Sequence, residues 1–236
     1  KTLDKVNAIS FAPGDKVLFK RGDSWAGSIT VKSSGTRGNP ITYGSYGSGN
    51  KPAISGFKTI TGWTDEGGGI FSKVISPGSA PNMLLIDGVQ QAIGRYPNNT
   101  YLTYESFNTN LSVTDDQLSS SPDWTGAEAV IYKNFYTIDR TNITSHSGGT
   151  LTYTSLGTSQ NASLNWGTPK SFIPNDVRIL DQSGAGYYDK KTGKLSVFFG
   201  TDDPSTKTTK VSVIDNLMFS HSSDYIVVDS LSFEGS

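Results

Sequence analysis

Apolar and polar residues alternate over most of the chain with the period of two that is typical of half-buried β-strands. In the N-terminal quarter, apolar pairs recur about every 12 positions, separated by Gly, Ser, Asn and Pro. These pairs are Val17 and Phe19, Ile29 and Val31, and Ile41 and Tyr43, followed by Ile54. Ile29 and Ile54 are 54 − 29 = 25 positions apart, which matches one turn of a parallel β-helix built from three short strands. A β-sandwich gives similar spacing, so spacing alone leaves both folds open.

The middle of the sequence is typical of antiparallel hairpins. Asp87-Gly88 favours a two-residue turn, and it separates the apolar run 83–86 from Val89. A second hairpin is predicted over residues 187–199, with Gly193 in the left-handed position that a longer turn requires. Further strands are predicted over 129–139, 151–154 and 176–180, and a glycine-rich loop over 62–69.

The two ends of the sequence are predicted to lie together. Residues 2–9 carry apolar side chains at three-residue steps behind a threonine that can cap a helix, which predicts one short helix. Near the C-terminus, Ile226 and Val228 share one strand face, and Leu231 and Phe233 share the same face after a change of phase. We expect these four side chains to join the N-terminal apolar pairs in one core. No capping segment follows Phe233, so we expect the protein to continue past the end of this sequence.

Composition and charge exclude several classes of function. With 20 basic and 21 acidic residues the net charge is −1, without the basic excess of a nucleic-acid binder. No apolar run reaches the roughly 18 residues of a membrane span. The chain has no cysteine, its two histidines are far apart, and it has no phosphate-binding loop or dinucleotide motif. We therefore predict no cofactor and no metal. The remaining carboxylates, amides, hydroxyls and aromatic rings are the groups with which proteins bind sugars.

The chain opens with the segments LDKVN (3–7), PGDKVLFKRGD (13–23), GNPITY (38–43) and KPAISG (51–56). Together they resemble secreted right-handed parallel β-helix proteins of the pectate-lyase-like superfamily. Asp87-Gly88 with GRYPN (94–98), and later residues 184–199, resemble two hairpins of a β-rich domain that some β-helix glycoside hydrolases insert after their first coil. Where such relatives usually carry Glu-Trp, this sequence has Ala185 and Gly186, so a contact made there by relatives is not expected here.

The resemblance implies an all-β fold: the start of a right-handed parallel β-helix with an inserted antiparallel β-domain. It divides the chain into an N-terminal cap with the first coils (1–56), an inserted β-rich domain (57–219) and a resumption of the β-helix (220–236). It also implies a location outside the cell or at its surface, and a polysaccharide or oligosaccharide partner.

The same resemblance implies that the chain is the N-terminal part of a glycan-directed protein. Hydrolysis of a glycosidic bond by paired carboxylates is the reaction expected of the whole protein. Similar enzymes place these carboxylates on later coils, so no residue of this chain is assigned as catalytic. A non-catalytic carbohydrate-binding or adhesin module is the alternative, and a polysaccharide lyase, which favours a more basic surface, is a further one.

Aromatic rings and an arginine are the candidate sugar-binding groups. Trp124 and Trp166 lie in polar, turn-rich segments, so we predict exposed rings that stack on a sugar face. Arg95 and Tyr96 form a second candidate, because a guanidinium binds paired hydroxyls or carboxylates and stacks on aromatic rings. The structural alternatives are core packing for the tryptophans and, for Arg95, an ion pair with the carboxylate at position 87 or 229.

Acidic residues are the last candidates for chemistry. The pairs at 115–116 and 202–203 could supply oxygen ligands to Ca²⁺, but neither has further acids at ligand spacing, so turn formation is the preferred interpretation. Asp229 and Glu234 are the carboxylates nearest the coil, and strand parity points them away from its core. The carboxylates of a glycosidase pair lie roughly 5 to 9.5 Å apart. For these two residues a solvated surface is the preferred interpretation.

Overall fold

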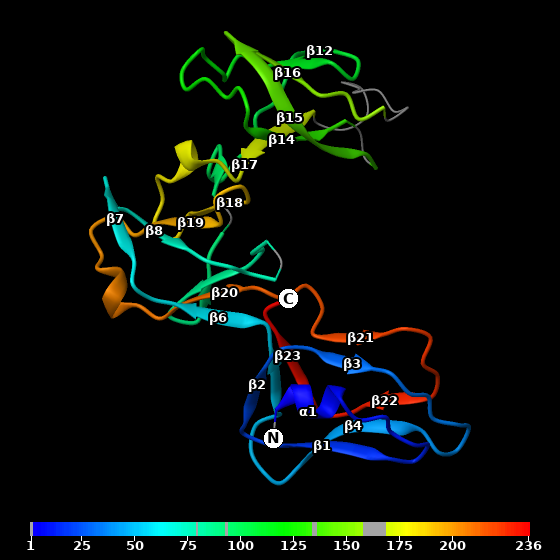
Figure 1. Ribbon diagram of the computed structural model, residues 1–236. Coiled ribbons are helices and arrows are strands. Elements are labelled where there is room, and N and C mark those ends of the chain that lie inside the picture. The colour runs from blue at the N-terminus through cyan, green and yellow to red at the C-terminus, as the bar shows by residue number, and fades with distance from the viewer. Residues whose placement is uncertain (1, 79, 93, 134–135, 158–168) are drawn as a thin grey trace. The chain divides into compact units, whose positions relative to one another are not determined.

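The computed structural model shows an all-β chain whose α-helix content, within the described residues, is the single short helix α1 (Leu3–Asn7) (Figure 1). The structure describes residues 2–78, 80–92, 94–133, 136–157 and 169–236. The predicted N-terminal helix is confirmed, although the Thr2 side chain makes no capping hydrogen bond. No helix in these ranges is long and apolar enough to cross a membrane.

Two compact units make up the chain, and both are discontinuous in sequence. The first contains the residues up to Thr61 together with Ile75–Gln90 and Lys207–Ser236, and the second contains Gly62–Val74 and Gln91–Thr206. The three-part division expected from the resemblance, with boundaries at residues 57 and 220, stays a prediction.

Three small sheets of the first unit are built from parallel strands only. Each sheet joins N-terminal strands to one strand from the C-terminal end, as Figure 1 shows for the blue and the orange-to-red segments. The sheets consist of β1 (Lys16–Lys20), β4 (Ile41–Tyr46) and β22 (Ile226–Val228); of β2 (Ser24–Ala26), β5 (Ala53–Ser55) and β23 (Ser232–Glu234); and of β3 (Ile29–Val31) and β21 (Met218–Ser220). The prediction that the two ends of the sequence lie together is confirmed.

Inward side chains of these strands form the core of the first unit. Its buried members are Leu3, Val17, Phe19, Ile29, Val31, Ile41, Tyr43, Ile54 and Leu217. Ile226 and Leu231 pack against this core, as predicted. Val228 and Phe233 lie in register with buried residues of the neighbouring strand but are 46% and 40% exposed. The prediction that these two are buried is wrong, because β22 and β23 are edge strands, which leaves one side of each side chain uncovered.

A fourth sheet of the first unit is antiparallel. Its strands, in spatial order, are β10 (Val89–Gln90), β9 (Leu84–Ile86), β20 (Thr209–Ser212) and β6 (Phe57–Ile60). Asp87 and Gly88 join β9 to β10 with φ of 51° and 80°, the left-handed values of a type I′ turn. The first predicted hairpin is therefore confirmed.

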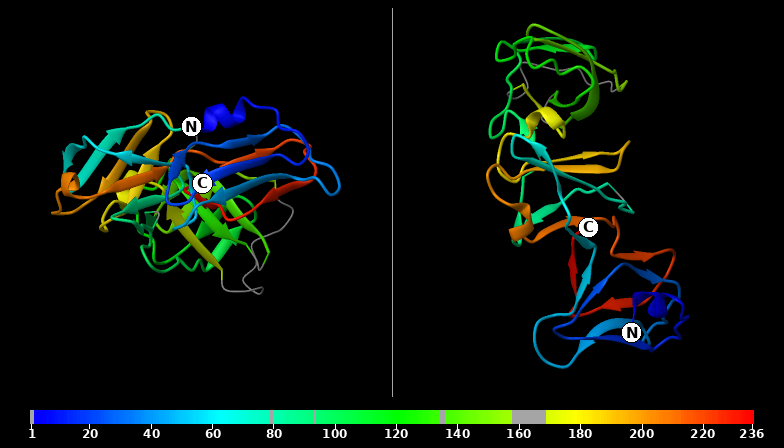
Figure 2. Two further views of the ribbon diagram at one scale, coloured as in Figure 1. Left: turned by 90° about the horizontal axis from the view of Figure 1, so that it is seen from below. Right: turned by 60° about the vertical axis from the view of Figure 1, so that its left-hand side comes forward.

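The second unit is built around a seven-stranded antiparallel sheet, seen from two further sides in Figure 2. Its strands, in spatial order, are β11 (Arg95–Tyr96), β17 (Lys170–Pro174), β14 (Glu128–Tyr132), β15 (Ile138–Ser147), β16 (Thr150–Tyr153), β13 (Ser112–Thr114) and β12 (Ser106–Asn108). Residues 129–139 were expected to form one strand. That prediction is wrong, because the chain reverses between β14 and β15 and the two strands pair.

A smaller sheet of the second unit has the order β18 (Gly186–Asp189), β19 (Lys194–Phe198), β8 (Ile70–Val74) and β7 (Thr64–Gly67). Gly193 has a φ of 69° between β18 and β19, so the second predicted hairpin is confirmed. The loop predicted over 62–69 is wrong. Gly68 and Gly69, with φ of 62° and 83°, form the tight turn of the β7–β8 hairpin.

The strand predicted over 176–180 is also wrong, because this segment contains the short 3₁₀ helix η1 (Val177–Ile179). Its local hydrogen bonding favours the helix, since the Asp176 side chain accepts a hydrogen bond from the main-chain N–H of Arg178. A second 3₁₀ turn, η2 (Pro204–Thr206), follows β19.

Candidate functional site

Arg95 is fixed at the edge of the seven-stranded sheet by main-chain and aromatic contacts. It lies in β11, opposite Pro174 of β17. Its Nε donates to the carbonyl oxygen of Pro97 at 3.0 Å, and its Nη2 donates to that of Thr100. Its guanidinium carbon lies 4.2 Å from the centre of the Phe172 ring. Its guanidinium carbon also lies 4.5 Å from the centre of the Tyr101 ring. Within the second unit, two carbonyl oxygens and two aromatic rings therefore hold Arg95, and the ion pair with position 87 or 229 stays a prediction.

Aromatic and cationic side chains gather on the face of the sheet to which Arg95 belongs. Directly opposite residues of neighbouring strands share a face, and Tyr132 lies opposite Lys170, two positions from Phe172. The alternate residues of both strands point into the core. Tyr101 joins the group, with its ring packed edge to face on Tyr132 and Phe172 at centre distances of 5.7 and 6.0 Å. We call Arg95, Tyr101, Tyr132, Lys170 and Phe172 the aromatic–cation cluster.

The members of this cluster perturb one another electrostatically. Hydrogen bonding with Arg95, and then with Tyr132, lowers the pKa of Tyr101. The Lys170 Nζ lies 5.1 Å from the centre of the Tyr101 ring and acts on this pKa in the same direction. Burial is the largest cause of the raised pKa of Tyr132, and hydrogen bonding with Tyr101 is the second largest. All five side chains are half-buried, so each is partly accessible to solvent. These groups stack on a sugar ring and bind its hydroxyl or carboxylate groups.

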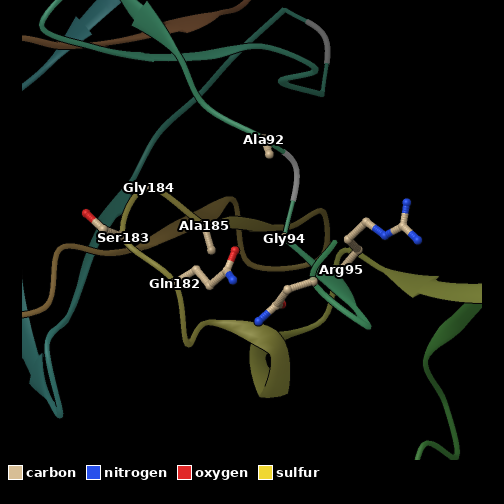
Figure 3. A pocket seen from close by; sticks show the side chains of 8 residues that line it. Ala92, Gly94, Arg95, Gln182, Ser183, Gly184 and Ala185 are labelled. Atoms are coloured by element: carbon tan, nitrogen blue, oxygen red, sulfur yellow. The ribbon is translucent and has the colours of Figure 1, made fainter. Parts of the chain in front are cut away.

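A small pocket lies next to Arg95 (Figure 3), and it is lined by Ala92, Gly94, Arg95, Asn98 and residues 182–185. Its volume of about 40 Å³ accommodates a water molecule or two but no sugar ring. Arg95 lines the pocket, but Figure 3 shows its guanidinium directed away from Gln182 and Ala185. Ala185 forms part of the pocket wall. The pocket alone is therefore no carbohydrate site.

Trp124 is a core residue. Its side chain is 1% exposed and packs against Tyr96, with ring centres 5.1 Å apart. The guanidinium of Arg178 lies 5.2 Å from the indole. A stacking platform must present a free ring face, so the prediction of an exposed Trp124 is wrong. The polar neighbours of Trp124 form a turn, and the ring points inward from it.

The remaining predicted site residues differ in how far the structure describes them. Tyr96 follows Arg95 in β11, and its ring packs against the core. The two side chains therefore serve opposite faces of the sheet, and only Arg95 belongs to the cluster. Trp166 lies outside the described residues.

The structure brings Glu105 next to the pair Asp115-Asp116. Glu105 precedes β12 and the two aspartates follow β13, so the antiparallel pairing of these strands places all three at the open end of one hairpin. One carboxylate oxygen from each residue lies within 4.8 Å of the others. Burial is the main cause of the raised pKa of Asp115, and the negative charges of Glu105 and Asp116 raise this pKa further. The hydrogen bond from the main-chain N–H of Gln117 acts in the opposite direction but does not outweigh them. These carboxylates could hold a cation.

The other acidic candidates behave as turn and surface residues. The carboxylate of Asp203 accepts hydrogen bonds from the main-chain N–H and the hydroxyl of Ser205, each at 2.8 Å, so the turn interpretation of the pair at 202–203 is confirmed. Asp229 and Glu234 are exposed, and each accepts a hydrogen bond from a nearby serine hydroxyl. This is the solvated surface that the sequence predicts.

Comparison with known proteins finds likeness at the level of fold. No protein-family model and no curated protein matches the chain. A solved structure described as a glycoside hydrolase is 15% identical with a TM-score of 0.71, over 94% of this chain and 43% of that one. A solved structure described as the complex of XylC with xylose is 12% identical with a TM-score of 0.48, over 98% of this chain and 32% of that one. The chain thus shares its all-β fold with part of a glycoside hydrolase, and it spans less than half the length of either protein.

Sequence analysis found Arg95 but missed the other four members of the aromatic–cation cluster. Tyr132 is in a strand with three buried residues, and Lys170 and Phe172 alternate with buried positions. An aromatic ring at an outward-facing strand position was the available clue. Tyr101 lies outside the regular strands, and only the folded chain brings its ring to the others.

Proposed function

We propose that this chain is the N-terminal part of a longer, secreted, glycan-directed β-helix protein, and that the whole protein is a glycoside hydrolase. The observation that carries this proposal is the likeness of fold, over 94% of the chain, to a structure described as a glycoside hydrolase. The 43% of that structure that the chain covers supports a longer parent protein.

The pairing of the first unit supports a β-helix. Lys16 pairs with Thr42 and Ser24 pairs with Ala53, so the partners are 42 − 16 = 26 and 53 − 24 = 29 positions apart. This is about one coil of three short strands. The C-terminal strands β21, β22 and β23 then add a rung to the same three sheets. A right-handed coil is the rule for parallel strands joined in this way.

The aromatic–cation cluster is the proposed contact with the glycan. It lies on an open sheet face and not in a closed cavity, which suits a polymer that runs across the surface. The Arg95 guanidinium lies over one face of the Tyr101 ring and one face of the Phe172 ring, so the proposed stacking surface is the part of each ring that Arg95 leaves uncovered. Lys170 and the N–H groups of Arg95 that do not bond to Pro97 and Thr100 are the proposed donors for hydroxyl or carboxylate groups. In the parent hydrolase, paired carboxylates cleave the glycosidic bond, and the cluster orients the chain of sugars.

Binding of soluble polysaccharides to the 236-residue chain tests the site. Calorimetric titration with neutral and with uronate-containing polysaccharides is expected to show binding that Tyr101→Ala and Phe172→Ala each weaken at least tenfold, as the loss of roughly 1.5–3 kcal/mol of ring burial predicts. Tyr46→Ala is the matched control, because Tyr46 is a 51% exposed tyrosine in the other unit. Circular dichroism shows whether each variant is folded. Wild-type affinity in both folded cluster variants, or no binding by the wild type, would overturn the site.

Activity of the full-length parent tests the reaction separately. A glycoside hydrolase releases reducing ends without the absorbance of an unsaturated uronate, whereas a lyase produces both. The 236-residue chain is expected to produce neither by itself. A parent that binds glycans through the cluster without cleaving them would replace the hydrolase with the non-catalytic binding module.

A further inference from the structure

Asp115 has a fully buried side chain with one carboxylate oxygen that lacks a donor. Its Oδ1 accepts a hydrogen bond from the Gln117 N–H at 2.8 Å. Its Oδ2 is buried and has no hydrogen-bond partner in the described part of the chain. A buried carboxylate oxygen without a partner is strongly unfavourable. Something that supplies positive charge or a donor is therefore expected at this position.

The main chain holds Asp115 rigidly beside the other two carboxylates. The N–H of Asp115 donates to the carbonyl oxygen of Gly149 at 2.9 Å, and a Cβ on Gly149 would meet the Asp115 carbonyl oxygen at 2.5 Å. The β15–β16 turn thus packs directly on Asp115. On the other strand, the N–H of Asp116 donates to Glu105 Oε2 at 2.9 Å. The fold keeps three like charges together, although their mutual repulsion would separate them.

We propose that Glu105, Asp115 and Asp116 bind a calcium ion, with one oxygen of each carboxylate as a ligand. Two oxygens that each lie about 2.4 Å from the same ion can be up to about 4.8 Å apart, and the three oxygens here fall within 4.8 Å of one another. Asp115 is the buried inner ligand. Glu105 and Asp116 are exposed, which leaves room for the water molecules that complete the coordination of the ion.

The donor set selects calcium among the common metals. Three carboxylates without nitrogen or sulfur ligands favour a hard cation over zinc or copper. Calcium accepts six to eight oxygens in irregular geometry, whereas magnesium demands a near-ideal octahedron. Sequence spacing could not indicate the site, because Glu105 is ten positions from Asp115 and reaches it only through the β12–β13 pairing.

A catalytic role fits the same residues less well. A carboxylic acid with a raised pKa beside a second carboxylate is the arrangement of a glycosidase pair. A general acid must touch the glycosidic oxygen, however, and Asp115 is 0% exposed. The calcium site is independent of the proposed glycan function, and in our interpretation it stabilises the β12–β13 hairpin at the edge of the seven-stranded sheet.

Calorimetric titration of CaCl₂ into the chelator-treated 236-residue chain tests the site. We expect one ion bound per chain, a rise in melting temperature with added calcium, and at least tenfold weaker binding of MgCl₂. No heat of binding and no change in melting temperature up to about 10 mM calcium, well above the range of extracellular calcium modules, would overturn the proposal. Magnesium binding as tight as that of calcium would overturn the assignment of the metal.

Variants locate the ion. Glu105→Gln and Asp116→Asn change exposed residues, so both are expected to fold and to bind calcium at least tenfold more weakly. Asp115→Asn is expected to abolish binding. Asp203→Asn is the matched control, because Asp203 also belongs to an Asp-Asp pair in a turn but lies outside the cluster. Wild-type affinity in both Glu105→Gln and Asp116→Asn, or a loss of affinity in Asp203→Asn as large as in those variants, would overturn the site.

Discussion

Replacing Trp124 tests whether its ring packs in the core or stacks on a sugar at the surface. Its indole is 1% exposed within the core of the second unit. Truncation of a large buried aromatic residue costs about 3–5 kcal/mol. The lost contacts include the Tyr96 ring at 5.1 Å and the Arg178 guanidinium at 5.2 Å. For Trp124→Ala we therefore expect a loss of about 3–5 kcal/mol in the free energy of unfolding, or roughly 6–20 °C in melting temperature.

Urea denaturation followed by near-ultraviolet circular dichroism measures this loss, and polysaccharide titration of the milder variant Trp124→Phe measures binding. Trp124→Phe is expected to lose part of the stability and to keep wild-type glycan affinity, because its ring never reaches the surface. The reasoning would be refuted by a Trp124→Ala variant that loses less than about 1 kcal/mol, or by a folded Trp124→Phe variant that binds glycan tenfold more weakly. Either result would restore the surface role that the sequence predicts.

Three further substitutions probe the second unit. Asp139→Asn removes the carboxylate paired with the fully buried Lys133 ammonium, which also donates to Asn110 Oδ1 at 2.5 Å. The loss is expected to cost about 3–5 kcal/mol of stability, measured by urea denaturation, and the double variant Lys133→Met/Asp139→Leu should recover much of it. An equally unstable double variant would contradict this. Burial raises the pKa of Asp176, but hydrogen bonds from Arg178 at 2.7 and 2.6 Å outweigh it and leave the pKa lowered. The ion pair therefore stabilises the fold above the unfolded pKa of about 3.9, and this contribution is lost as pH falls through the folded pKa of Asp176. In urea denaturation, the free energies of unfolding of the wild type and of Asp176→Asn should differ by about 1.5–3 kcal/mol at pH 7, and the difference should shrink below pH 4. A difference that does not change with pH would refute this role of Asp176. Gly184→Ala should lose more than about 1 kcal/mol of the free energy of unfolding, because the φ of Gly184 is +84° and the new Cβ would clash with the side-chain oxygen of Gln91. A melting temperature equal to that of the wild type would contradict this, since it would show that the turn relaxes freely.

Local rules predicted the elements whose geometry depends on a few neighbouring residues. The type I′ turn at Asp87-Gly88 and the left-handed Gly193 follow directly from turn chemistry, and both hairpins were predicted correctly. The same rules failed where one residue type serves two structures. The glycines at 68 and 69 were assigned to an open loop, although their positive φ makes a tight turn between strands.

Sites that depend on the pairing of distant strands could not be predicted from the sequence. The direction of the Trp124 ring is set by the core beneath its turn, which the polar neighbours do not reveal. Glu105 meets Asp115 only because β12 and β13 pair in a particular register. The aromatic–cation cluster likewise joins three separate segments of the chain, and only Arg95 has a local sequence that singles it out.

The strand pairing of the first unit sets the order in which parts of the chain can fold during synthesis. Its parallel strand β3 pairs with β21, and Ile29 is in register with Met218, which is made 218 − 29 = 189 positions later. At roughly 5–20 residues per second, a ribosome needs on the order of 10–30 s to supply the partner after β5 has emerged. The second unit is encoded between these strands and can fold first. During that interval the nascent N-terminal strands expose their apolar faces, so a chaperone that binds extended apolar segments would meet them before their partners exist.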